Sequence, residues 1–414
     1  MTSASPVRAP SAPSPVVDVF REPTYRRLWA SGLCVSVARW MDLVTLGWLA
    51  LELTGSPFMV GLAAFARSAP MMLLGPLAGI IADRVSRGHV LLVTQAGGAG
   101  TAIALAAIFG SGAGGYGPLI TLEVVFGILW SLDFPARRTV LMSLLGPARV
   151  AQAISLETVS MQVAKMGGPL LAGVCLARFG PASAYALLAV FYAAGLAACL
   201  GLHRTIGGPT WQGSASVTRT LRTGLRSAWA SPVVRSVLLC TVAMNVLFFP
   251  YQHMLPVFAR DVLAGGPTVL GALVAADGFG ALVGALAIAG ARGHLAYPRL
   301  FATAVMVAPV ILVGFSLSRE LAVCLALLAA IGVAESGFAA MQSTLVLLSA
   351  PPSARGGTMG ILSACIGTQP VGTLAIGLLA AAVGAPAAFA VNAVVALVVI
   401  VPLAVPLARR GSLG

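Results

Sequence analysis

The chain consists of long apolar stretches separated by short polar gaps. Each stretch runs for roughly 20 residues or more, enough for a helix to cross about 30 Å of hydrocarbon. The apolar runs are uninterrupted, whereas the strands of a membrane barrel alternate apolar and polar residues. Because backbone polar groups in lipid must be satisfied internally, these stretches are predicted to be transmembrane helices. The twelve predicted helices cover 28–53, 57–82, 90–110, 117–145, 150–179, 181–202, 233–263, 268–291, 298–317, 320–350, 357–383 and 386–407.

A polar segment rich in Gly, Ser, Thr and Arg divides the predicted helices into six and six. Residues 127–141 align with 332–346 at a constant offset, which indicates that the halves repeat one another. Parallel repeats are typical of transporters that rock two bundles around a central site. We therefore expect an all-α polytopic membrane protein with two pseudo-symmetric six-helix bundles. The expected units are a disordered cytoplasmic tail (1–19), an N-terminal bundle (20–202), a basic cytoplasmic linker (203–232), a C-terminal bundle (233–408) and a cytoplasmic tail (409–414).

The 25 basic residues are distributed unevenly between the two sides of such a protein. Most of them lie in gaps on one side, and only Arg178, Arg260 and Arg319 fall on the other. This is the positive-inside pattern, so both termini are expected in the cytoplasm and the chain in the inner membrane. The net charge of +13 then reflects topology and attraction to lipid headgroups, not nucleic-acid binding.

The composition excludes a water-soluble protein. Hydrophobic residues make up 58% and charged residues 9%, with a mean hydropathy of +0.96, whereas soluble domains carry about 25% charged residues. The six cysteines lie inside apolar stretches without the spacing of a metal site or a disulfide framework. The sequence has no Walker A motif, and its single lysine, Lys165, lies outside any such loop. We therefore expect no metal, no cofactor and no ATP hydrolysis, and we expect a proton gradient to supply the energy.

A loop motif lies between the second and third predicted helices. Residues 79–88 (GIIADRVSRG) resemble the signature G-x-L-A-D-R-x-G-R-K of the major facilitator superfamily. The matching positions are Gly79, Ala82, Asp83, Arg84 and Arg87. The resemblance implies the twelve-helix fold of this superfamily and secondary transport by alternating access, usually by a monomer.

Further motifs are similar to those of one branch of the superfamily. Gly168-Pro169 with Gly173 resembles the helix-packing motif of drug antiporters. Together with residues 54–57 (TGSP) and 134–137 (FPAR), the pattern resembles the enterobactin-exporter and macrolide-efflux branch, which implies export in exchange for protons. The chain departs from many drug antiporters at Glu123, where they carry an arginine. Their arginine-based proton step is therefore not carried over.

The resemblance also implies gating residues at the cytoplasmic side, namely Asp83, Arg84, Arg87 and Asp133. Asp83 is expected to face the start of the eleventh helix near Gly357, whose free N–H groups favour a carboxylate. Arg87 is expected to pair with Asp133. These contacts would hold the halves together and break as the transporter opens inward. The alternative is a solvated loop pair that contributes about 0–1 kcal/mol.

Arg39 and Asp42 lie near the middle of the first predicted helix, three residues apart, and share one helix face. An ionised side chain at that depth costs about 3 kcal/mol or more, which argues that it faces a cavity or a partner. One hypothesis makes Asp42 a proton-binding carboxylate whose ionised form Arg39 favours when close. The alternative is a permanently neutralised pair that stabilises packing.

Other charged residues inside the predicted helices are Glu123, Glu157, Lys165, Asp277 and Glu335, with Arg67 as a further cation that could complete a pair. Lys165 is expected to be a counter-ion to Glu123 or Asp42, to bind an anionic substrate group, or to belong to a structural pair. His253 is expected to line a central cavity together with aromatic and Met residues of the first, fourth, seventh and tenth helices, namely Trp40, Trp130, Met244, Phe248, Phe249, Tyr251, Phe338 and Met341. These residues are the candidates for proton coupling and substrate binding.

The expected function is secondary active export of a small amphipathic molecule, such as a drug, a siderophore or another natural product. Uptake or facilitated diffusion is the main alternative, because alternating access is reversible. An intramembrane enzyme is disfavoured, since H-E-x-x-H is absent and Ser336 and His253 form no recognisable catalytic pattern. A receptor would require larger soluble segments than the linker. The expected partners are a small-molecule substrate and membrane lipid.

Overall fold

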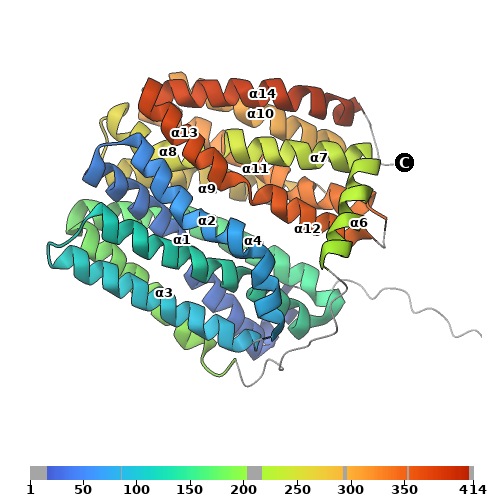
Figure 1. The fold of residues 1–414 in the computed structure, drawn as a ribbon, viewed down its shortest axis with the longest axis horizontal. Coiled ribbons are helices and arrows are strands. Elements are labelled where there is room, and N and C mark those ends of the chain that lie inside the picture. The colour runs from blue at the N-terminus through green and yellow to red at the C-terminus, as the bar shows by residue number, and fades with distance from the viewer. Residues whose placement is uncertain (1–15, 85, 203–216, 292–295, 352–353, 410–414) are drawn as a thin grey trace, which may run out of the picture.

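The computed structural model describes residues 16–84, 86–202, 217–291, 296–351 and 354–409. Within these ranges the chain is helical apart from short connections and contains no strand. Figure 1 shows two groups of roughly parallel helices lying side by side, the first half of the chain from blue to green and the second from yellow to red. The all-α polytopic architecture expected from the apolar runs is confirmed.

The first half begins with a short 3-10 helix, η1 (Val16–Arg21), followed by α1 (Pro23–Thr54), α2 (Pro57–Arg84), α3 (Arg87–Gly110) and α4 (Tyr116–Cys199). Helix α1 starts on a proline, whose missing N–H is not needed in a first turn. It ends at Gly55, which adopts the left-handed conformation (φ 64°) and donates its N–H to the Leu51 carbonyl. This is the glycine C-cap that commonly terminates a helix.

Helix α4 covers the three helices predicted between residues 117 and 202. A straight helix of its 84 residues would be about 126 Å long, several times the thickness of a bilayer. The run instead folds back on itself. The stacked rings of Phe126 and Tyr192, whose centroids lie 5.6 Å apart, show that its two ends lie side by side. Gly180 has a φ of 78° and is followed by a proline, which interrupts the helical geometry between the fifth and sixth predicted helices.

The second half of the chain contains shorter helices. Its elements are α6 (Val217–Ala230), α7 (Pro232–Ala243), the π-helix η2 (Met244–Phe248), α8 (Tyr251–Asp261), α9 (Pro267–Gly290), α10 (Tyr297–Leu317), α11 (Leu321–Ser349), α12 (Arg355–Ile366), α13 (Gln369–Val383) and α14 (Ala385–Arg409). The seventh predicted helix is thus divided into α7, η2 and α8, and the eleventh into α12 and α13. Helix α6 lies within the predicted linker.

The described helices provide the expected membrane crossings. Ten helical stretches are long and apolar enough to span a bilayer, and Pro57–Leu73 is a shorter apolar helix. One of the ten, Gln152–Cys199, has 48 residues, which is enough for two crossings. These stretches therefore accommodate the twelve predicted crossings.

The two halves pack tightly at one end of the molecule. Helix α6 and the C-terminal end of α14 lie at the right in Figure 1 and mark the end called here the linker end. At the opposite end, a Cβ on Gly61 of α2 would lie 2.8 Å from the Thr373 carbonyl oxygen of α13. On α1, a Cβ on Gly47 would lie 2.8 Å from Pro256 of α8. Glycine at these positions allows the helices of the two halves to approach closely.

Candidate transport cavity

A cavity of about 480 Å³ lies between the two halves. Helices α1, α2 and α4 line it from the first half, and η2, α8, α9, α11, α12 and α13 line it from the second. Its volume is within the roughly 300–1,000 Å³ of small-molecule sites. Its aromatic lining consists of Trp40, Trp130, Phe134, Phe249 and Phe338. Because both halves contribute to its wall, any relative movement of the halves reshapes the cavity.

The first charged cluster, called here the Arg67 cluster, consists of Arg67, Asp42, Glu123 and Tyr185. An Arg67 Nη2 lies 2.7 Å from Asp42 Oδ2, and its Nε lies 3.5 Å from Glu123 Oε2. The Tyr185 hydroxyl donates a hydrogen bond of 3.3 Å to Glu123 Oε1. Arg67 lines the cavity, whereas both carboxylates are buried behind it. One guanidinium therefore serves two acids within the first half.

Helix packing fixes the Arg67 cluster in place. Gly127 lies one turn after Glu123 on α4 and packs directly on the Arg67 carbonyl of α2, where a Cβ would not fit. The glycine brings α4 close to α2, so that the Glu123 carboxylate reaches the guanidinium. The sequence suggested Arg39 as the partner of Asp42, and that pairing is wrong. Arg39 instead places its guanidinium carbon 4.0 Å from the Trp130 ring centroid.

The second charged cluster, called here the Lys165 cluster, joins the two halves. Lys165 Nζ of α4 lies 2.9 Å from Asp277 Oδ2 of α9 and 3.0 Å from Glu335 Oε2 of α11. The Tyr251 hydroxyl lies 3.3 Å from each of the two carboxylates, and Gln252 Nε2 donates to both at 3.1 Å. One expectation was that Lys165 pairs with Glu123 or Asp42, and the structure does not show that pairing. Its acids come from the other half of the chain.

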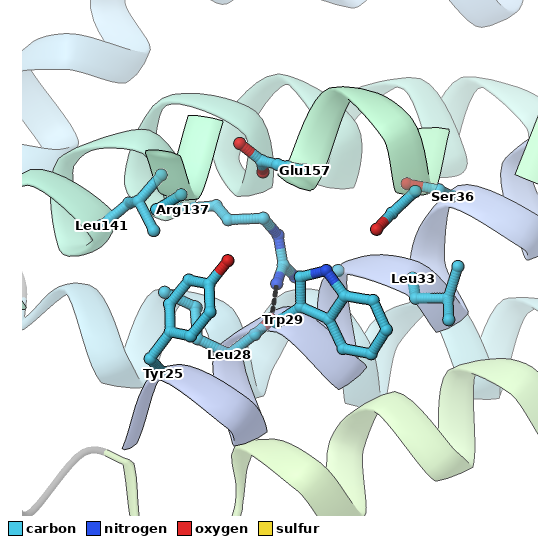
Figure 2. Close-up of a pocket in the computed structure, with 11 residues that line it drawn as sticks. Tyr25, Leu28, Trp29, Leu33, Ser36, Arg137, Leu141 and Glu157 are labelled. Carbon is cyan, nitrogen blue, oxygen red and sulfur yellow. Dashed lines mark hydrogen bonds between the residues drawn. The ribbon is translucent and has the colours of Figure 1, made fainter. Parts of the chain in front are cut away.

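Two further residues that were expected to take part in proton coupling or substrate binding lie in different places. His253 of α8 lines the cavity, as expected. Glu157 lies away from it, 3.7 Å from Arg138 Nε, and lines a small pocket inside the first half (Figure 2). That pocket, of about 20 Å³, has room for roughly one water molecule. Glu157 therefore cannot contact a molecule bound in the transport cavity.

The candidate gating residues are only partly described. The side chains of Asp83 and Arg84, at the end of α2, lie outside the described residues, so the expected contact of Asp83 with the region of Gly357 is untested. Asp133 is bound by Arg137, whose Nε lies 3.1 Å away, and by Thr94 and Gln95 of α3. These groups, not the expected Arg87, hold the Asp133 carboxylate. Arg87 is the first residue of α3.

The Gly-Pro motif lies where the fifth predicted helix meets two others. A Cβ on Gly168 would lie 2.9 Å from the Val37 carbonyl oxygen of α1. On the same helix, a Cβ on Gly173 would lie 2.6 Å from the Pro267 carbonyl oxygen of α9, and Gly271 of α9 packs on the Pro169 carbonyl. The motif therefore lies at the interface between the two halves, a few residues after Lys165 in the chain.

Two interruptions of the helices beside the cavity were not predicted. The π-helix η2 brings Asn245 and the adjacent Phe249 to the cavity wall, and Gly367 and Gln369 line it at the break between α12 and α13. Short π-helical segments often occur at functional sites. In the sequence, Pro250 and the Gly367-x-x-Pro370 spacing are the features that could have indicated these two interruptions. Met244, Phe248, Tyr251 and Met341, expected to line the cavity, are buried in the packing instead.

Comparison with known proteins gives concordant matches along the chain. A family model described as transmembrane secretion effector matches residues 14–411. The multidrug efflux pump Tap of Mycolicibacterium fortuitum is 25% identical over 368 residues, which cover 87% of this chain and 90% of Tap. The staphyloferrin A transporter of Staphylococcus aureus is 23% identical over 63% of this chain, and the match spans 65% of that protein's length.

Solved structures show the same fold at low sequence identity. A POT family transporter in complex with a thioalcohol-conjugated peptide superimposes with a TM-score of 0.75 at 12% identity, over 92% of this chain and 95% of that one. The human organic anion transporter MFSD10 superimposes with a TM-score of 0.64 at 16% identity, over 94% and 100% of the two chains. The relatives and the fold are those of transporters and not of enzymes.

Proposed function

Because the chain belongs to the transmembrane secretion effector family of the major facilitator superfamily, we propose that it exports a small amphipathic molecule in exchange for protons. The chain is a multi-pass membrane transporter, and the cavity between its halves is the place for the transported molecule. The family description and the similarity to a multidrug efflux pump support the outward direction. The proposed setting is the inner membrane, with both termini in the cytoplasm and the protein working as a monomer among membrane lipids.

The arrangement of the Arg67 cluster carries the proposal of proton exchange. Two buried carboxylates, Asp42 and Glu123, share the single guanidinium of Arg67 in the cavity wall. Two like charges that share a dry site repel each other, so one proton bound between them makes the cluster neutral. The groups around this proton are the guanidinium groups of Arg67 and of Arg39 on α1, and the neutral hydroxyl of Tyr185.

The Lys165 cluster links proton binding to movement of the halves. Lys165 belongs to the first half, whereas Asp277 and Glu335 belong to the second. A proton on either acid weakens its attraction to the ammonium group and lowers the free energy needed to separate the halves. Release of that proton restores the ion pair. Proton binding and alternating access are therefore coupled through differential contacts in the two states.

Purified protein in liposomes with an imposed pH gradient tests the proposal. We expect a gradient that is acidic on one side to drive an amphipathic dye toward that side, and reversal of the gradient to reverse the flow. Anionic and cationic dyes are tested in parallel. Empty liposomes and liposomes at equal pH serve as controls. A transport rate that is the same with and without the gradient would contradict proton exchange. Movement of dye away from the acidic side would instead favour proton-coupled uptake.

A further inference from the structure

Among the described residues, the cavity wall carries three cations, Arg39, Arg67 and Lys165, and one carboxylate, Glu335. Two of these cations are engaged, since Arg67 and Lys165 each hold two acids within ion-pair distance. Within the described part of the chain, Arg39 forms no hydrogen bond or ion pair, and its guanidinium lies over the ring of Trp130. Arg39 is thus the one lining cation without an acceptor from the protein.

The position of Arg39 on Trp130 leaves its donors available. A guanidinium stacks on an aromatic ring through its flat face, and its five N–H donors lie in the plane around its edge. Stacking at 4.0 Å therefore holds the group in a fixed orientation without using its hydrogen bonds. An ionised group at this depth of a membrane protein is costly unless it serves a partner or a cavity. The fork matches the two oxygens of a carboxylate.

We propose that the transported molecule carries an anionic oxygen group, of the carboxylate type, that binds Arg39 against Trp130. The inference rests on the proposed function, since it assigns the substrate class of the same cavity. The apolar body of the molecule packs on Phe249 and Phe338 of the opposite wall. Glu335 does not repel the anion strongly, because Lys165, Tyr251 and Gln252 already hold its oxygens.

A pair of probes with one aromatic body and opposite charges tests the inference. Binding of 2-naphthoate and of 2-naphthylmethylammonium to the purified full-length protein is measured by titration calorimetry. We expect the wild type to bind the anion more tightly than the cation. Arg39→Gln should weaken anion binding by roughly 10- to 100-fold, as expected for loss of a charged hydrogen bond. It should not weaken cation binding, because it removes a positive charge from the cavity wall. Arg39→Lys should recover part of the loss, since it keeps the charge without the fork.

Arg138→Gln is the matched control. Arg138 also lies over an aromatic ring, with its guanidinium carbon 5.5 Å from the Phe134 centroid, but it pairs with Glu157 and does not line the cavity. It should bind the anion as the wild type does. Melting temperatures of all variants distinguish lost binding from lost folding, and the Arg39→Lys protein keeps the test valid if Arg39→Gln does not fold.

Two outcomes overturn the inference. One is a wild type that shows no preference for the anion over the cation, including binding of neither probe. The other is an Arg39→Gln protein that folds and still binds the anion with wild-type affinity. Either result leaves proton exchange to be judged by the liposome experiment. Failure of gradient-driven transport alongside normal anion preference would reject the proposed exchange and retain the anion site.

Discussion

At the residue scale, Arg67 lies within ion-pair distance of two buried acids of the first half, Asp42 and Glu123. We expect Arg67→Gln to destabilise the protein by roughly 3–5 kcal/mol, since removing one partner of a buried ion pair leaves uncompensated charge. The measurement is the apparent melting temperature of the purified protein. The double variant Arg67→Gln with Asp42→Asn removes one of the stranded charges and should regain part of the stability. A double variant no more stable than Arg67→Gln would contradict this account.

Glu335 is the acid of the Lys165 cluster that also lines the cavity. Glu335→Gln keeps the shape of the side chain but cannot release a proton. We expect this variant to exchange substrate between compartments of equal pH while losing accumulation driven by a pH gradient. Both rates are measured in the same liposome preparation. Retained gradient-driven accumulation would mean that a proton on Glu335 is not needed for coupling, and that proton exchange at the Arg67 cluster drives transport without it.

At the residue scale, the sequence identified the charged groups but not their pairing. Arg39 and Asp42 share a helix face, yet Asp42 binds Arg67 of another helix because α2 packs directly beside it. The acids bound by Lys165 lie 112 and 170 residues further along the chain. Which of several acids meets a given cation depends on the packing of helices, and neither spacing nor hydropathy contains that information.

The packing of α2 on α13 closes the end of the molecule opposite the linker end. A side chain at Gly61 would meet the Thr373 carbonyl oxygen and the Gly377 Cα, 2.8 and 3.0 Å from its Cβ. We therefore expect Gly61→Val to prevent this closed arrangement and to favour states in which the two halves separate there. Spin labels can be placed at Leu53, exposed near the end of α1, and at Val383, exposed at the end of α13. The distance between the two labels should be longer in the variant than in the wild type.

Gly100 provides the control for this substitution. It lies on α3, and a Cβ at this position would have no neighbouring atom within 4 Å, so Gly100→Val adds the same side chain without a clash. Its label distances should match those of the wild type. Equal distances in Gly61→Val and Gly100→Val would show that the contact between α2 and α13 does not control closure.

At the element scale, the apolar runs predicted where the helices lie but not where they break. Hydropathy is the same for a regular and an interrupted helix, so the seventh and eleventh predicted helices were drawn as continuous. In the structure, Gly372 of α13 packs on the Val246 carbonyl of η2, beside Pro250. The two interruptions thus lie side by side, and their mutual packing stabilises each of them. A single-sequence pattern does not reveal such a contact.

At the scale of the whole molecule, the distribution of basic residues predicts which end faces the cytoplasm. Ser111, exposed between α3 and α4, and Arg409, exposed at the end of α14, lie on opposite sides in this topology. In a cysteine-free background, a membrane-impermeant thiol reagent added to intact cells should label Ser111→Cys and not Arg409→Cys. Labelling of both after cell lysis is the control. The reverse pattern in intact cells would invert the proposed orientation.

The chain contains one lysine, and its ammonium group lies at the boundary of the two bundles, bound to acids of the opposite bundle. Apart from the amino terminus, the protein therefore offers amine-directed reagents a single target. That target is shielded while the ion pairs hold and becomes nucleophilic when they part and the amine loses its proton. Acylation of Lys165, followed by mass spectrometry, would thus time the separation of the bundles in the unmodified protein, without an engineered label.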